Sequence, residues 1–213
     1  KLELTWIGKN NPEYDIASIE PRILEERSEL SYGDKKTNNM IIHGDNLLAL
    51  KALLPEYEGE IKCIYIDPPF NTGSAFEHYD DSVEHSTWVT LMKTRFELLL
   101  QLLNKTGFLL VHLNEEEIAY ARVLLDEIFG RGNYLNMISL STNDPSGFKA
   151  TSSTIFSTAN YILIYAKDKP SSKLKKLYVE KAYDKAYSKV LKDRKLPYNE
   201  WEWENISDIV ARE

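Results

Sequence analysis

A chain of 213 residues, 43% of them hydrophobic and 28% charged, has the composition of one sizeable globular domain with a real core. No run approaches the roughly 18 consecutive apolar residues of a membrane span, and the N-terminal residues lack the apolar core of a signal peptide, so a cytoplasmic location is expected. The formal net charge of -7 argues against a uniformly basic nucleic-acid-binding protein.

The charge is unevenly distributed along the chain. Residues 167–195 hold eleven Lys or Arg and four Asp or Glu, a net charge of +7, while the rest of the chain carries -14. This asymmetry indicates an anionic partner near the C-terminal part, although a solvated helical face would give the same pattern. The single cysteine, Cys63, cannot form an internal disulfide and is expected to be a small buried hydrophobic residue.

The first part of the chain predicts an arm followed by a strand, a helix and a second strand. Residues 1–39 are polar and irregular, and we expect Trp6 and Ile7 to anchor this N-terminal arm on the domain. Residues 40–42 predict a short apolar strand, and the leucine-rich segment after it predicts an amphipathic helix. The apolar run at 62–66 is typical of a strand buried on both faces. Such a unit predicts two parallel strands joined by a right-handed connection.

The alternation of helices and strands continues, which predicts an α/β fold. The further elements are a long amphipathic helix that starts near Ser86 or Thr87 and ends before Gly107, a buried strand at 107–113, a helix at 114–130, and strands at 134–140 and 160–167. Asn114 suits the N-cap of its helix and Gly130 the terminator. The loop between the last two strands, about twenty residues long, is unusual enough to indicate a functional role. From residue 168 the pattern becomes Lys-rich and helical, so we expect a subdomain boundary there.

The segment from Cys63 to Gly73 reads CIYIDPPFNTG and places an acid, two prolines and an aromatic ring directly after a strand. Proline cannot donate to a β-ladder and keeps the residue before it extended, so Asp67 is held stiffly at the carboxyl end of the strand. Ligands of open α/β sheets bind at that edge. The Asp67 carboxylate and the Pro68 carbonyl are acceptors, and the Phe70 ring is a flat apolar surface.

Two acceptors beside a stacking surface suit a planar heterocycle with an exocyclic amino group, such as adenine. The lone pair of that amino group is delocalised into the ring, and two acceptors drawing on its N–H bonds would direct the lone pair at an electrophile. Alignment of bound reactants can supply roughly 7 to 11 kcal/mol of a barrier, against about 1.5 to 3 kcal/mol for a charge-assisted hydrogen bond. Orientation is therefore expected to matter more than acid-base strength.

The motif IYIDPPFNTG resembles the catalytic motif of the amino-group DNA methyltransferases. The neighbouring segments IIHGDNLLALKALLP, HYDDS, LLDEIFGRGNY and YILIYAK are similar to those of β-class adenine-N6 methyltransferases, including the modification subunits of type III restriction systems. The likeness covers about residues 1–168. It implies a Rossmann-like S-adenosylmethionine-dependent methyltransferase fold, with a mostly parallel sheet that includes an antiparallel strand. It also implies S-adenosylmethionine as methyl donor and direct transfer to N6 of an adenine flipped out of double-stranded DNA.

The resemblance also implies a role for each residue of the motif. Asp67 and the Pro68 carbonyl would hold the adenine amino group, Pro69 would keep the turn rigid, and Phe70, where Tyr is commoner, would stack on the base. Asp67 and Asp45 would also contact the cofactor. For Asp45 the alternative is a helix N-cap, and the two roles can coexist.

Partners follow from the same resemblance. Residues 169–213 are expected to begin the target-recognition region, and the lysines expected to contact DNA phosphates are Lys149, Lys173, Lys175 and Lys176. A homodimer and a restriction subunit with nuclease or helicase activity are the expected protein partners.

The family's glycine-rich cofactor loop, Phe-x-Gly-x-Gly, is absent from the 213 residues, as are a Walker-type loop and a GxGxxG fingerprint. In the β class that loop lies C-terminal to the target-recognition region, so we expect this chain to be a fragment with an incomplete fold. On its own it is expected to be inactive and to bind the cofactor weakly or not at all.

Other interpretations of the sequence stay open. A metal site could be drawn from His78, Asp80, Asp81, Glu84 and His85, but their spacing matches no ligand signature, and ordering a loop over the base suits them better. Trp201 and Trp203 could stack on bases or pack against another part of the protein. RNA adenine and protein glutamine methyltransferases also carry a Pro-Pro-aromatic motif, although the glutamine enzymes use Asn where this chain has Asp67. A non-catalytic module for DNA binding or assembly is the remaining alternative.

Overall fold

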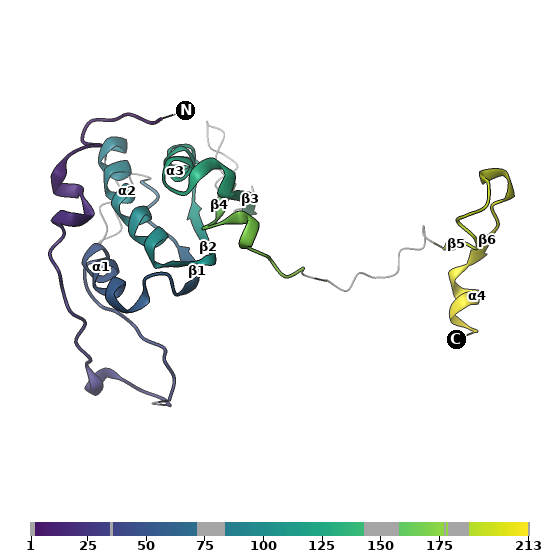
Figure 1. Ribbon diagram of the computed structural model, residues 1–213, viewed down its shortest axis with the longest axis horizontal. Helices are drawn as coiled ribbons and strands as arrows, with labels where there is room; N and C mark the ends of the chain where they lie inside the picture. Colours follow the sequence, from purple (N-terminus) through teal and green to yellow (C-terminus); the bar gives the residue numbers. More distant parts are fainter. Residues whose placement is uncertain are drawn as a thin grey trace, which may run out of the picture. The chain divides into compact units, whose positions relative to one another are not determined.

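A four-stranded mixed sheet forms the centre of the N-terminal part of the computed structural model (Figure 1). Its strands are β1 (Ile61–Ile66), β2 (Leu103–Leu113), β3 (Tyr134–Ser141) and β4 (Ala159–Ala166), in the order β1-β2-β4-β3. β1 and β2 are parallel, whereas β2 with β4 and β3 with β4 are antiparallel. The predicted α/β class is confirmed, and parallel pairing is limited to one of the three strand pairs in the described sheet. A parallel pair needs a crossover connection, which α2 (His85–Leu102) supplies between β1 and β2.

The structure describes residues 3–34, 36–71, 84–142, 158–176, 178 and 188–212. They belong to two compact units, Lys1–Lys173 and Leu174–Glu213, which are treated separately below. None of the helices in these ranges is long and apolar enough to cross a lipid bilayer.

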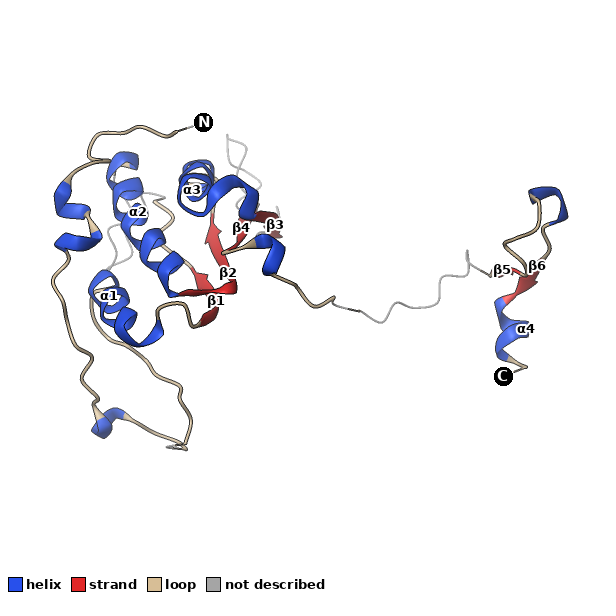
Figure 2. Cartoon of the chain, in the orientation of Figure 1, coloured by secondary structure: helices blue, strands red, loops and turns tan. Residues whose placement is uncertain are grey.

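The described residues of the first unit include the helices α1 (Asn46–Tyr57), α2 and α3 (Ile118–Leu125). α2 contacts both other helices and β2, and lies between α1 and α3 in Figure 1. α3 runs on into a π-helical turn, η4 (Asp126–Gly130). The short 3-10 helices of this unit are η1 (Pro12–Tyr14), η2 (Ile16–Ser18), η3 (Ser28–Leu30), η5 (Arg131–Asn133) and η7 (Lys169–Ser171). Figure 2 shows how much of the chain before α1 is loop.

The core lies between α2, α3 and the sheet. α2 contributes residues at helical spacing, and β2 contributes alternate residues of one face. The members from these two elements are Trp88, Val89, Met92, Phe96, Leu99, Leu103, Leu109, Val111 and Leu113. Tyr165 of β4 is fully buried, and its hydroxyl donates to Asp126 Oδ1 over 2.6 Å. Burial raises the pKa of this phenol, and the hydrogen bond to Asp126 acts in the same direction.

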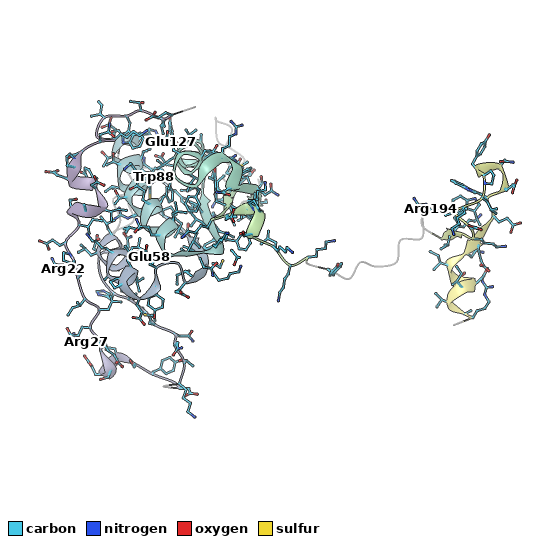
Figure 3. The ribbon with its side chains drawn as sticks, in the orientation of Figure 1. Arg22, Arg27, Glu58, Trp88, Glu127 and Arg194 are labelled. Carbon is cyan, nitrogen blue, oxygen red and sulfur yellow. The ribbon has the colours of Figure 1, made fainter. Side chains whose placement is uncertain are left out.

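The N-terminal arm is fixed at one of its two predicted anchors. The indole nitrogen of Trp6 donates to Thr90 Oγ1 over 2.7 Å, and Trp6 packs against the core. The ammonium of Lys9 lies 2.8 Å from Glu127, which also accepts from the backbone of Leu4 (Figure 3 labels Glu127). Ile7 is 90% exposed, so its predicted anchoring role is wrong.

Two predictions about the first strands are wrong. Residues 40–42 form no strand, and Ile41 is fully exposed, because no described strand lies beside this segment to pair with it. The parallel unit of the structure is therefore β1, α2 and β2. β1 is present as predicted, but it is covered on one face only and even there is only half-buried: Ile64 and Ile66 pack against the core, while Cys63 and Tyr65 are exposed. Cys63 is one of these exposed residues, so it is not a buried hydrophobic residue.

The remaining helix and strand predictions are close to the structure. β3 and β4 confirm the predicted strands, and β2 begins at Leu103, earlier than expected. α2 begins at His85 with Glu84 at the N-cap position and no side-chain cap. Asn114 accepts from the backbone of Glu116 over 3.1 Å, but the N-cap position of α3 is taken by Glu117, so the predicted N-cap role of Asn114 is wrong. Gly130 ends the helical region with a φ of 84°, a left-handed conformation that favours glycine.

The described residues of the second unit form a small antiparallel hairpin and one short helix. β5 (Lys189–Leu191) pairs with β6 (Trp203–Asn205), followed by α4 (Ile206–Val210), and the connection contains the 3-10 helix η8 (Tyr198–Glu200). The helical pattern expected from residue 168 onward is wrong for the described residues. Pro197 helps explain this result, because proline disfavours helix at the residue before it and lacks the N–H that a helix interior requires.

Candidate active site

Asp67 lies directly after β1, at the carboxyl end of the strand. Its side chain is 59% exposed, whereas Pro68, Pro69 and Phe70 are half-buried. The described residues donate no hydrogen bond to the carbonyl of Pro68. Two acceptors and an aromatic ring therefore lie next to one another in the chain at the edge of the sheet where ligands of open α/β sheets bind.

Trp88 of α2 contacts the turn formed by residues 67–70, called the DPPF turn below. Its indole nitrogen donates to the carbonyl of Pro69 over 2.8 Å, and its side chain is almost fully buried among core residues (Figure 3). A buried indole N–H needs an acceptor, and the Pro69 carbonyl provides it. The same hydrogen bond holds that carbonyl in place. The turn is thus tied to α2, and the rigidity of the two prolines is not its only restraint.

His112 on β2 contacts both functional side chains of the motif. Its Nδ1 lies 3.4 Å from Oδ1 of Asp67, and its ring meets the Phe70 ring edge-on with centroids 5.3 Å apart. The side-chain amide nitrogen of Asn160, on β4, lies 3.0 Å from His112 Nε2. Both ring nitrogens of His112 therefore have a polar neighbour, and the ring is held between Asp67 and Asn160.

Asp45 occupies the N-cap position of α1. Its Oδ1 accepts from the backbone nitrogens of Leu47 and Leu48 over 2.9 and 3.1 Å. The helix N-cap role, which was the alternative for Asp45, is therefore confirmed. Both of these hydrogen bonds go to one carboxylate oxygen, so the N-cap role is compatible with a cofactor contact, which stays a prediction.

Three of the four lysines expected to contact DNA lie in the described part of the chain. Lys149 lies outside the described residues. Lys173 ends the first unit, and Lys175 and Lys176 belong to the second; all three are exposed. Their role stays a prediction.

The residues considered for a metal site do not form one in the described part of the chain. His78, Asp80 and Asp81 lie outside it. Glu84 takes the N-cap position of α2, and His85 pairs with Glu117. The described residues include no group of three or more His, Cys, Asp or Glu side chains placed to hold a metal ion.

The tryptophans of the second unit lie against each other. Trp201 and Trp203 meet edge-on with ring centroids 6.2 Å apart, and both remain partly exposed. The indole of Trp201 donates to the Leu196 carbonyl over 2.7 Å. The hairpin therefore holds its own aromatic pair, and whether this pair meets bases stays open.

The chain belongs to the family described as DNA methylase, since the family model for N6 and N4 methylases matches residues 61–212. This match includes the whole DPPF turn, Trp88 and His112.

Among curated proteins, the chain is 45% identical over 104 residues to a probable type III restriction-modification enzyme HindVI Mod subunit of Haemophilus influenzae. That match covers 49% of this chain and 14% of the relative. The chain is 28% identical to the type III EcoPI Mod subunit of Escherichia phage P1, over 78% of this chain and 30% of that protein. It is 34% identical to the type II methyltransferase M.EcaI of Enterobacter cloacae, over 71% and 35%.

The chain therefore spans about a third or less of the length of these three relatives. Among solved structures, the complex of M1.HpyAVI with SAM matches 66% of this chain and 60% of its own at 18% identity, with a TM-score of 0.44. Membership of the family rests on the family model.

Two contacts of the site were not predicted from the sequence. Trp88 falls in the segment HSTW, which follows the motif, and His112 is the single polar residue near the end of an apolar strand. Since neighbouring parallel strands end at the same edge of a sheet, a polar residue at the end of β2 was the available signal for His112.

Proposed function

We propose that this chain carries the catalytic motif of a site-specific adenine-N6 DNA methyltransferase of a restriction-modification system. The observation that carries the proposal is the turn after β1, in a chain of the N6 and N4 DNA methylase family. There the exposed Asp67 carboxylate adjoins the Phe70 ring and the Pro68 carbonyl, which accepts no hydrogen bond from the described residues. The relatives named Mod subunits of type III enzymes favour this kind of system.

The proposed role of this turn is to position the adenine amino group for methyl transfer. Asp67 and the Pro68 carbonyl accept the two N–H groups of the adenine amino group, which aims its nitrogen lone pair away from them. Phe70 stacks on the base that has left the duplex, and such stacking is worth about 1 to 3 kcal/mol. Pro69 keeps Pro68 and Phe70 at fixed angles, and Trp88 secures the Pro69 carbonyl.

S-adenosylmethionine, when bound, supplies the electrophilic methyl group. The residues present suit the ammonium or amino group of this cofactor, which needs hydrogen-bond acceptors. The half-exposed Asp67 carboxylate at the end of β1 can accept hydrogen bonds in addition to its contact with His112. Asp67 would therefore contact it, with Asp45 as a second carboxylate. The exposed lysines Lys173, Lys175 and Lys176, with Lys149, would meet DNA phosphates.

The partners follow from the same proposal. The substrate is double-stranded DNA, and a restriction subunit is the expected protein partner by analogy with the Mod subunits. Formation of a homodimer, and the assignment of residues 169–213 to target recognition, remain predictions.

The test is an assay of the whole protein with methyl-labelled S-adenosylmethionine and either duplex DNA or RNA. Nucleoside analysis of the products should show N6-methyladenine in the DNA. N4-methylcytosine, methylated RNA or labelled protein would replace the proposed acceptor. DNA binding without any methylated product would instead support a non-catalytic DNA-binding or assembly module.

A further inference from the structure

Glu117 is a fully buried acidic residue beside the motif that the proposed chemistry does not use. It lies at the N-cap position of α3 and is 0% exposed. Burial of a carboxyl group costs several kcal/mol of folding free energy unless hydrogen bonds replace those to water. The hydrogen-bond partners of Glu117 therefore indicate its role.

Both described partners of the Glu117 carboxyl group meet the same oxygen. Oε1 accepts from the side-chain amide of Asn71 over 2.6 Å and lies 2.8 Å from Nδ1 of His85. The other oxygen, Oε2, is buried and has no hydrogen-bond partner among the described residues. One acceptor atom therefore joins two segments that are separate in the sequence.

Asn71 is the residue after Phe70. Its φ of 59° is in the left-handed region, which Asn tolerates better than other residues that carry a side chain. Its side chain is tied to Glu117, so the path of the chain leaving Phe70 is fixed from the side as well as by the prolines.

His85 is the first residue of α2, one helical turn before Trp88, which donates to the Pro69 carbonyl. The His85 ring also packs against Tyr120 of α3, with centroids 5.1 Å apart. The start of α2 thus reaches the DPPF turn by two routes, one directly through Trp88 and one through His85, Glu117 and Asn71.

Burial raises the pKa of the Glu117 carboxyl, while the hydrogen bond from Asn71 and the nearby His85 act in the opposite direction. Burial is the larger effect. The geometry shows that Glu117 acts through one oxygen, Oε1, which lies within hydrogen-bond distance of both Asn71 and His85.

We propose that Glu117 is a positioning residue of this site, which holds Asn71 and the start of α2 in one arrangement so that the base-binding turn is formed before substrate arrives. Its effect on the reaction rests on the proposed function, whereas the bridge itself does not. A displacement of about 1 Å in an active site can cost about 100-fold in rate, which sets the scale of the expected effect.

The experiment compares Glu117→Ala, Glu117→Gln and the matched control Glu116→Gln in the whole protein. Glu116 is the exposed neighbour of Glu117, so its variant makes the same change of charge outside the bridge. We expect Glu117→Ala to lower kcat about 100-fold with little change in the KM values for DNA and cofactor. Glu117→Gln keeps an acceptor oxygen and should restore most of the rate, and Glu116→Gln should match the wild type.

Hydrogen-deuterium exchange provides a measurement that does not depend on activity. Glu117→Ala should speed exchange both around residues 70–71 and at the start of α2, and the control should not. The proposal would be overturned if Glu117→Ala had the kcat and the exchange rates of the wild type. It would also be overturned if Glu117→Gln had a kcat as low as that of Glu117→Ala.

Two further variants decide the outcome if Glu117→Ala does not fold. Asn71→Gly keeps access to the left-handed backbone and removes the side-chain amide that donates to Glu117. His85→Ala removes the other donor from a side chain that is 54% exposed. Wild-type kcat in both would show that the bridge has no role. If the wild type methylates nothing, the proposed function fails, and the exchange data alone still support or overturn the bridge.

Discussion

Nδ1 of His112 lies 3.4 Å from Oδ1 of Asp67, which connects the end of β2 to the acid that follows β1. The two strands are parallel neighbours, and Ile66 is paired with Val111, so Asp67 and His112 both follow directly on a paired position. Asn160 of β4 lies against the far side of the same imidazole. Residues at the ends of β1, β2 and β4 therefore fix the orientation of the Asp67 carboxylate.

The first prediction is that His112→Ala slows methyl transfer by about tenfold, because the His112 ring lies against both Asp67 and Phe70 and keeps them in place. A displacement of about 1 Å in an active site can cost about 100-fold in rate, and a smaller displacement costs less. The exposed His43 is the control, and His43→Ala should leave kcat unchanged. Single-turnover methylation by the whole protein measures both. Equal rates for the two variants would remove His112 from the site.

Asp67→Ala should abolish measurable transfer, a loss of at least about 1,000-fold, on the scale found when a positioned hydrogen-bonding group is removed from an active site. DNA binding should persist, because Asp67 meets the amino group of the base and no phosphate. Methylation assays and gel shifts on the same preparation distinguish these effects. A mutant that loses both together would point to a structural role for Asp67.

Replacement of Phe70 separates stacking from the hydroxyl that the commoner Tyr carries. Phe70→Tyr should retain activity, and Phe70→Ala should weaken the hold on a flipped base by about 1 to 3 kcal/mol. The readout is the fluorescence of a base analogue placed at the target adenine. If the Ala variant gives the same signal as the wild type, the ring does not stack on the base.

A fourth prediction concerns stability. Tyr165→Phe removes a buried hydroxyl that donates to Asp126 over 2.6 Å and leaves that carboxylate without one of its donors. We expect a loss of about 1 to 3 kcal/mol of unfolding free energy, measured by urea denaturation of the 213-residue chain. Tyr32→Phe, at a fully exposed position, should cause no change.

Local pattern was sufficient for β1, β2, β3 and β4, because each is rich in apolar residues and finds a neighbouring strand. Residues 40–42 have the same pattern and stay exposed, since an apolar run does not specify whether a partner strand is available. The stiff acid after β1 could be predicted from Pro68 alone. The contacts of Trp88, His112 and Glu117 could not, because they depend on how α2, α3 and the sheet pack.

The last prediction is that the 213-residue chain alone binds S-adenosylmethionine weakly or not at all. The chain contains no Phe-x-Gly-x-Gly sequence, and a glycine-rich turn at a helix N-terminus is what normally lets backbone approach such a cofactor closely. Asp67 and Asp45 provide carboxylates only, and Asp45 already caps α1. Titration calorimetry is the direct measurement, with the whole protein as the positive control. A stoichiometric site of micromolar affinity on the 213 residues would show that other parts of this chain replace the glycine loop.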